Sequence, residues 1–239
     1  MDGPKLADGR TEALSYLFYF ADGGNGEFQN GRRTRRMTTG ALAQARTWYA
    51  EARQRAFSWR EELPWIEKAA HALALACLTA LAAQVRIPLP FTPVPITGQV
   101  FAVLLSGVLL GGGYGALSQL FYVGMGAAGV PWYAGFTGGA AQLLGPTGGY
   151  LVGFIIAALG IGLVTQKFPF ARRFLPQCLL MLAGVGVIYL LGGAYYSWVM
   201  STGLRDTLAQ AIVPFIAVDV GKALLAASLS TGLLPQRGG

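Results

Sequence analysis

Two charged residues inside the last long apolar run are the strongest candidates for chemistry. Asp219 and Lys222 lie within residues 211–233, three positions apart. An ionised side chain near the centre of a transmembrane helix costs about 2.5 to 3.5 kcal/mol, so neither belongs in contact with lipid. Residues spaced by three share one face of a helix, and that face should point into the protein. We interpret the pair as part of a substrate or proton pathway; a purely structural ion pair is the alternative.

The composition around this pair is typical of a membrane protein. The 239 residues are 54% hydrophobic and 12% charged, with a mean hydropathy of +0.48, whereas soluble domains carry about 25% charged residues. Most of the charges lie in residues 1–68. We therefore divide the chain into a polar N-terminal extension, 1–65, and a membrane domain, 66–235. Residues 1–36 are expected to be disordered, and Met37 is an alternative start.

Residues 41–63 have the periodicity of an amphipathic helix. Apolar and aromatic residues recur there every three or four positions, within an arc of about 120°. Arginines follow one edge of this stripe, where they can reach lipid phosphates while tryptophan rings sit at the level of the headgroups. We predict an interfacial helix; a helix that docks on another protein is the alternative. The net charge of +7 is thus attributed to contact with anionic lipid, not to nucleic acid.

Six apolar segments predict an all-α membrane domain with six transmembrane helices. Several segments are near the short limit for a span, which implies tilt or local thinning of the bilayer. The segments are residues 66–84, 96–111, 114–128, 148–165, 177–198 and 211–233.

Basic residues in the connections predict the orientation. Residues 167–173 contain three of them, and Arg237 lies on the same side if there are six spans. Because cytoplasmic loops are enriched in Lys and Arg, both termini should be cytoplasmic. Residues 85–95 and 129–147 should then face outward, in a multi-pass protein of the cytoplasmic membrane.

Both outward segments have unusual compositions. Residues 86–97 hold four prolines, which predict a stiff, extended lid that neither continues a helix nor joins a sheet. Residues 131–150 mix glycines with aromatic rings, including Tyr133, that can stack on a flat ligand; an aromatic belt is the alternative. The run at 145–150 lacks the Lys-Ser/Thr ending of a phosphate loop, so ATP hydrolysis by that route is excluded.

Small residues recur at the four-residue spacing that lets membrane helices approach closely. We expect the glycines to pack inside the bundle, whereas the alanine face either packs internally or contacts a second membrane protein. With two cysteines and one histidine in the chain, we expect neither a metal site nor a cofactor. The small residues are Ala72, Ala76 and Ala80, Gly107 with Gly111, and Gly149 with Gly153.

Four sequence features together resemble the BioY family, the biotin-specific substrate-binding subunits of energy-coupling factor (ECF) vitamin transporters. They are RIPLPFTPVPITGQ at 86–99, the aromatic-glycine stretch at 131–139, LGPTGGYL at 144–151, and the Asp219-xx-Lys222 pair. The resemblance spans about residues 66–235. It implies a six-helix subunit, not an enzyme, that captures biotin from outside beneath its first and third loops. It also implies a transmembrane coupling protein and two ATPase subunits as partners.

The same resemblance implies a set of site residues. An intramembrane enzyme that uses the charged pair as acid and base remains an alternative, although no nucleophile accompanies the pair. A passive channel or scaffold, which needs no tight ligand, is a further one. The expected ligand-binding residues are Asp219, Lys222, Trp132, Tyr150, Gln142, Phe136, Thr97 and Arg86, and the expected partner-binding residues are Ala72, Ala76 and Ala80.

Overall fold

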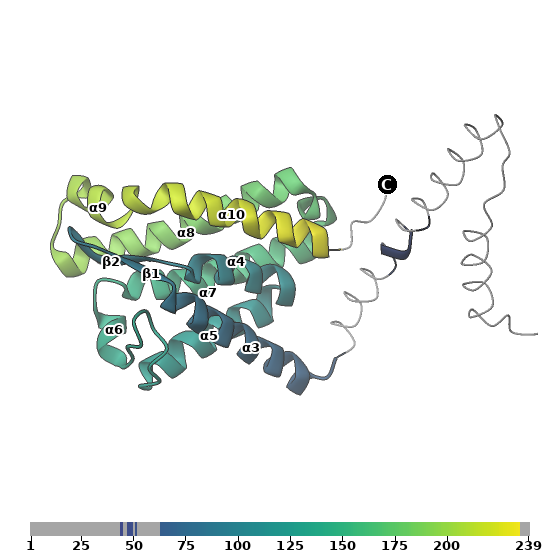
Figure 1. Cartoon of the computed structure of the whole chain (residues 1–239), viewed down its shortest axis with the longest axis horizontal. Helices are drawn as coiled ribbons and strands as arrows, with labels where there is room; N and C mark the ends of the chain where they lie inside the picture. The colour runs from purple at the N-terminus through teal and green to yellow at the C-terminus, as the bar shows by residue number, and fades with distance from the viewer. Residues whose placement is uncertain (1–43, 45–46, 50, 52–62, 235–239) are drawn as a thin grey trace, which may run out of the picture. The chain divides into compact units, whose positions relative to one another are not determined.

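The computed structural model describes residues 44, 47–49, 51 and 63–234. The described positions before residue 52 are helical, and Trp48 is 70% exposed there. The rest of the interfacial helix predicted over 41–63, like residues 1–36, lies outside the described residues. Residues 63–234 form a helical body (Figure 1).

Each of the six apolar segments forms a long helix, although residues 96 and 97 of the second segment belong to the strand that precedes its helix. The short helices α6 (Ala140–Leu144) and α9 (Leu204–Ala211) and a 3₁₀ turn, η1 (Pro169–Arg172), lie between them. The long helices are α3 (Trp65–Gln84), α4 (Gln99–Leu110), α5 (Gly112–Ala127), α7 (Gly148–Lys167), α8 (Phe174–Met200) and α10 (Val213–Leu233).

Four of these helices, α3, α7, α8 and α10, are long and apolar enough to cross a membrane. Helices α4 and α5 have 12 and 16 residues, which corresponds to about 18 and 24 Å of rise, less than the ~30 Å hydrocarbon core. Gly111 alone separates them, with a φ of 80° that favours glycine. The prediction of a mostly helical, integral membrane protein is confirmed at this level.

The proline-rich segment forms a β-hairpin, so the prediction that it cannot join a sheet is wrong. Strands β1 (Arg86–Leu89) and β2 (Thr92–Thr97) pair antiparallel. The registered pairs are Arg86 with Thr97, Ile87 with Ile96 and Leu89 with Thr92, and none of them contains a proline. In a two-stranded sheet each strand has a free edge, where the missing N–H of proline costs no ladder hydrogen bond.

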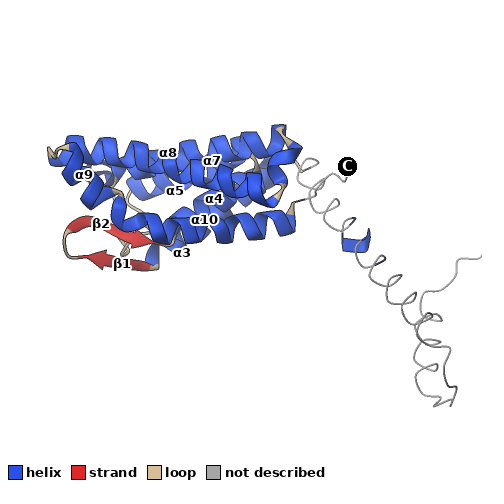
Figure 2. Ribbon diagram, turned by 90° about the horizontal axis from the view of Figure 1, so that it is seen from above, coloured by secondary structure: helices blue, strands red, loops and turns tan. Residues whose placement is uncertain are grey.

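The hairpin, α6 and α9 lie at one end of the body, which we call the hairpin end (Figure 1). Strand β2 contacts α9 there, and Figure 2 shows the hairpin projecting beside the helices. The turn η1 and the first residues of α3 lie at the opposite end. Residues 85–95 and 129–147, which the sequence assigns to one side of the membrane, therefore lie at the same end of the body.

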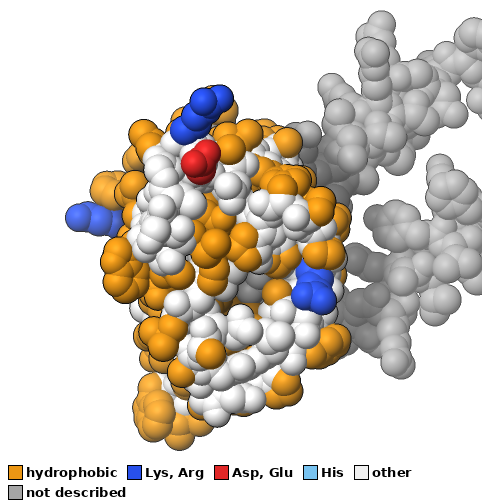
Figure 3. Space-filling view, turned by 90° about the vertical axis from the view of Figure 1, so that its left-hand side faces the viewer, with side chains coloured by type: hydrophobic (Ala, Val, Ile, Leu, Met, Phe, Trp, Pro, Cys, Tyr) orange, Lys and Arg blue, Asp and Glu red, His pale blue; other side chains and the backbone are white. Residues whose placement is uncertain are grey.

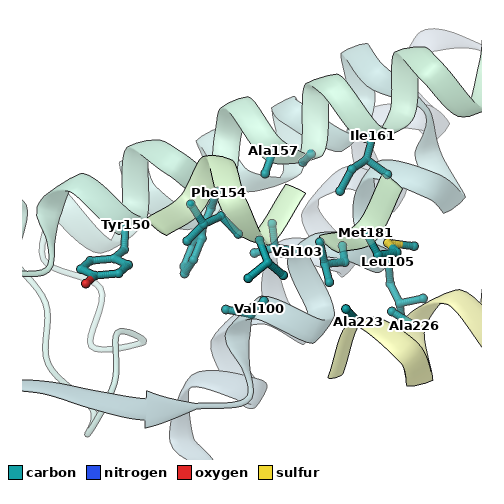
Figure 4. Close-up of a cluster of buried hydrophobic side chains, with 14 of the residues drawn as sticks. Val100, Val103, Leu105, Tyr150, Phe154, Ala157, Ile161, Met181, Ala223 and Ala226 are labelled. Atoms are coloured by element: carbon teal, nitrogen blue, oxygen red, sulfur yellow. The ribbon is translucent and has the colours of Figure 1, made fainter. Parts of the chain in front are cut away.

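The core forms where α4, α7, α8 and α10 meet. Phe154 and Ile161 of α7 point towards Val103 of α4, and Met181 of α8 lies level with Ala223 of α10 (Figure 4). All of these side chains are buried.

Glycines allow the helix backbones to touch. A Cβ atom at Gly107 would lie 2.6 Å from the carbonyl oxygen of Ala158, and one at Gly153 would lie 3.0 Å from the Cα of Ile188. The prediction that these glycines pack inside the bundle is confirmed.

A buried polar cluster joins the first three long helices. Nε2 of Gln119 on α5 lies 3.3, 3.0 and 3.0 Å from the hydroxyl oxygens of Thr79, Ser106 and Ser118, which share its two protons. All four residues have no exposed surface. Each hydroxyl donates in turn to a carbonyl of its own helix at 2.8 to 3.0 Å. Polar contacts of this kind hold helices together where no water is available.

The structure corrects the expectation that an alanine face of α3 contacts a partner protein. Ala72, Ala76 and Ala80 are 0, 0 and 7% exposed, because α3 packs this face against α4 and α5. Their methyl groups let α3 approach closely enough for Thr79 to reach Gln119. Helix α3 instead exposes large side chains, among them Leu81 at 69%.

Candidate ligand-binding site

A cavity of about 290 Å³ lies at the hairpin end. Its walls come from β2, from the loop before α6, and from helices α4, α5, α7, α8 and α10. Figure 3 views the body from this end, where charged side chains are few and lie towards the rim. The segments that the sequence predicts to be outward-facing thus contribute to one cavity.

The charged pair of α10 lies in the wall of this cavity. Lys222 Nζ is 2.6 Å from Asp219 Oδ1, and the Tyr189 hydroxyl of α8 donates to Asp219 Oδ2 at 2.7 Å. Asp219 is 4% exposed, so the predicted orientation of this face into the protein is confirmed. Lys222 also donates to the carbonyl of Thr97. An ammonium has three protons to donate, and these two contacts leave one for a ligand.

Thr97 connects the hairpin to two helices. Its hydroxyl donates to Gln99 Oε1 at 2.7 Å, and Gln99 Nε2 donates to the Tyr122 hydroxyl of α5 at 2.6 Å. Its carbonyl accepts from Lys222 of α10. The end of β2 is thereby fixed over the cavity by Lys222 directly and by Tyr122 through Gln99.

Tyr122 and Tyr133 form a second wall of the cavity, and Trp132 packs against Tyr122. Tyr122 has its ring centroid 5.7 Å from that of Trp132 and 5.5 Å from that of Tyr133. The Trp132 indole donates to the Tyr122 carbonyl at 2.9 Å, and the Tyr133 hydroxyl donates to the Val123 carbonyl at 2.5 Å. Burial raises the pKa of the Tyr133 phenol to about 12, so this donor stays protonated at neutral pH.

Most of the residues predicted to bind a ligand come together around the cavity. Trp132 is not among the lining residues, because its indole turns back onto Tyr122. Phe136 is 73% exposed, with a left-handed φ of 57°, and also lies away from the lining. The predicted residues that line the cavity are Arg86, Thr97, Gln142, Tyr150, Asp219 and Lys222.

Several residues that line the cavity were not predicted from the sequence. Tyr122, Gln99 and Tyr189 are polar groups inside or beside apolar runs, where a buried hydroxyl or amide needs a partner. That requirement is the signal that would have found them. Phe154 carries no such signal, because an apolar ring looks the same whether it faces lipid or a cavity.

Fold and site together define an integral membrane protein with a small-ligand cavity built around a buried ion pair. A family model described as the BioY family matches residues 52–238, so the chain belongs to the BioY family. This confirms the resemblance carried by the hairpin, the aromatic-glycine stretch and the Asp-xx-Lys pair.

Named relatives and a solved structure agree with this assignment to the BioY family. The biotin transporter BioY of Thermotoga maritima is 42% identical over 147 residues, covering 62% of this chain and 85% of the relative. The one from Rhizobium etli is 34% identical over 169 residues, covering 68% and 90%. A crystal structure of the S-component for biotin from an ECF-type ABC transporter aligns with a TM-score of 0.65 at 27% identity, covering 73% of this chain and 93% of that one. These proteins are transporters or transporter components, not enzymes.

Proposed function

We propose that this chain captures biotin from outside the cell, as the substrate-binding subunit of an ECF vitamin transporter in the cytoplasmic membrane. Membership of the BioY family supports the ligand. The observation that carries the proposal is the bonded set of Asp219, Lys222 and Tyr189 in the wall of the cavity. The cavity volume of about 290 Å³ is near the lower end of the range for small-molecule sites, ~300 to 1,000 Å³.

In the proposed topology all six long helices span the bilayer and both termini are cytoplasmic. The hairpin end then faces outward, and Lys167, the last residue of α7, and Arg173, which precedes α8, lie at the cytoplasmic end, as the positive-inside rule favours. The short pair α4 and α5 would cross where the bilayer thins, at a modest cost per ångström of mismatch.

Charge counting suggests how biotin lies in the cavity. Biotin has a neutral ureido ring and one carboxylate. A carboxylate beside Asp219 and Lys222 would put two negative charges against one positive charge in a poorly solvated site, which is costly. A ureido ring there keeps the group neutral, because Asp219 can accept from its N–H groups and Lys222 can donate to its carbonyl oxygen. We therefore place the ureido ring deep in the cavity.

The carboxylate would then lie near the mouth, where Arg86 lines the cavity and is exposed. Gln142 lines the same cavity and offers an amide donor. Capture alone does not move the ligand. No Walker A motif occurs in the chain, so transport would use the ATPase subunits of the proposed complex, joined through the transmembrane coupling protein.

Binding of labelled biotin to the purified protein tests the ligand, with an unlabelled biotin amide as competitor to test the orientation. Asp219→Ala and Lys222→Ala should each remove most binding of both ligands, because each leaves a buried charge unpaired. Arg86→Ala should mainly reduce the preference for the free acid. Lys167→Ala, which removes a positive charge at the opposite end, is the control and should bind both ligands as the parent does.

Two outcomes would contradict the proposal. An absence of saturable biotin binding by the parent protein would reject the ligand. If Lys222→Ala erased only the preference for the free acid, with binding of the amide intact, the deep position would hold the carboxylate instead.

A further inference from the structure

Gln84, the last residue of α3, is bonded to the loop that carries the aromatic wall. Its Nε2 lies 3.2 and 3.1 Å from the carbonyl oxygens of Trp132 and Tyr133, and its Oε1 accepts from the Phe136 N–H at 3.0 Å. Nε2 also donates to the Ala80 carbonyl of its own helix at 3.0 Å. The two Nε2 protons are shared among three carbonyls, and one side chain thus contacts three backbone groups of a segment some fifty positions away.

The same residue stands at the base of the β-hairpin. A single residue, Val85, separates it from β1. Directly after β2, where the hairpin returns to its base, the Gly98 N–H donates to the carbonyls of Ala82 and Val85, at 3.1 and 3.0 Å. These bonds close the base of the hairpin onto the turn of α3 that holds Gln84. Any displacement of that base therefore carries Gln84 with it.

The hairpin and the loop cover the same cavity. Thr97 of β2 and Tyr133 of the loop both line it. A second contact joins them, since a Cβ atom built at Gly135 would lie 2.4 Å from Arg86 Nη1. Arg86 is exposed, however, and Gln84 is the residue that holds the loop through its backbone.

We infer that Gln84 is a positioning residue that fastens loop 131–139 to the hairpin, so that the two cover the cavity as one unit. The inference rests on the proposed function only for the identity of the enclosed ligand. Without the amide, the loop loses its side-chain hydrogen bonds to α3, namely the one from the Phe136 N–H and those to the Trp132 and Tyr133 carbonyls, and it opens independently. A bound ligand then escapes more readily, whereas its entry is affected less.

The first experiment measures the two covering segments without a ligand. Spin labels are placed at cysteines replacing Phe91 of the hairpin and Phe136 of the loop, which are 55 and 73% exposed. The background carries Cys77→Ser and Cys178→Ala. The distance distribution between the labels should be narrow with Gln84 present and broad in Gln84→Met, which keeps the length of the side chain but removes its hydrogen bonds.

Gln166→Met is the matched control, because the Gln166 Oε1 accepts from the Gly112 N–H at 3.0 Å, away from the cavity. It should keep the narrow distribution. An equally narrow distribution in Gln84→Met would overturn the inference.

The second experiment measures the dissociation and association rates of labelled biotin. Gln84→Met should dissociate about tenfold faster or more, with an association rate within about threefold of the parent. Gln84→Glu should behave in the same way, because its carboxylate would face the carbonyls of Trp132 and Tyr133. A purely stabilising role predicts a lower thermal midpoint with an unchanged dissociation rate, and that result would overturn the inference.

The two experiments separate the two proposals. If the parent protein binds no biotin, the proposed function fails, and the label distances still decide whether Gln84 joins the loop to the hairpin.

Discussion

Glycines bring backbones into contact at both ends of the body, but at the hairpin end polar side chains also form hydrogen-bonded chains around a cavity. Thr97, Gln99 and Tyr122 make one such chain. At the other end, a Cβ atom at Gly162 would lie 2.3 Å from the backbone nitrogen of Gly112.

Buried polar groups show the same contrast. Asp219 accepts hydrogen bonds on both carboxylate oxygens, from Lys222 and Tyr189. At the opposite end, Gln177 is fully buried, and neither polar atom of its side chain has a hydrogen-bond partner among the described residues. The hairpin end is thus electrostatically organised before a ligand arrives, and the other end is held by close contact between backbones. We therefore assign ligand capture to the hairpin end of the bundle and close packing of the helices to the opposite end.

Labelling of single cysteines tests which side of the membrane each end of the body faces. Phe91→Cys at the hairpin should react with an impermeant maleimide in intact cells, and Arg173→Cys only after permeabilisation. Both sites are exposed, and Cys77→Ser with Cys178→Ala removes the native thiols. The expected difference is all or none, and the reverse pattern would invert the topology.

Two substitutions on α7 test the close contact at the opposite end. Gly162→Ala should lower the stability by about 1 to 3 kcal/mol, because the added methyl group meets the backbone of Gly111 and Gly112. Gly160→Ala meets no atom within 4 Å and should leave the stability unchanged or raise it by up to about 1 kcal/mol. Thermal unfolding in detergent compares the two variants. Equal midpoints would show that the methyl group added at Gly162 causes no steric conflict at this end.

Tyr189→Phe tests the hydrogen bonding of the charged pair at the hairpin end with the smallest change in structure. It removes the hydroxyl that donates to Asp219 Oδ2 while keeping the ring, so biotin binding should weaken about tenfold. Tyr114→Phe on α5, whose ring is not part of the cavity lining, is the control and should bind as the parent does. Titration of both variants with labelled biotin decides the matter. Unchanged affinity in Tyr189→Phe would mean that Lys222 alone is sufficient to position the carboxylate of Asp219.

The helices and the charged pair were predictable because lipid imposes a strict rule. An apolar run long enough to approach a span becomes a helix, and two ionised groups at membrane depth must face inward. That reasoning located Asp219 and Lys222 in the bundle interior, where the structure has them.

The remainder depended on contacts between distant segments. Prolines weaken an interior strand, but an isolated hairpin accepts them at its edges, and only the pairing register shows this. The alanine spacing of α3 fits an internal or an external partner helix equally well. Aromatic residues in a glycine-rich loop point into or out of a site according to backbone turns, which left Trp132 and Phe136 off the cavity and Tyr133 on it.

The amide of Gln119 has a consequence for how the protein enters the membrane during synthesis. The hydroxyls of Thr79, Ser106 and Ser118 bond to carbonyls of their own helices, so each of them can enter lipid already satisfied. The Gln119 amide has no such local carbonyl among its contacts, and α3 and α4 supply two of its acceptors. The Gln119 amide of α5 therefore finds these acceptors in lipid only after α3 and α4 have inserted. Both helices precede α5 in the chain, so they are synthesised first.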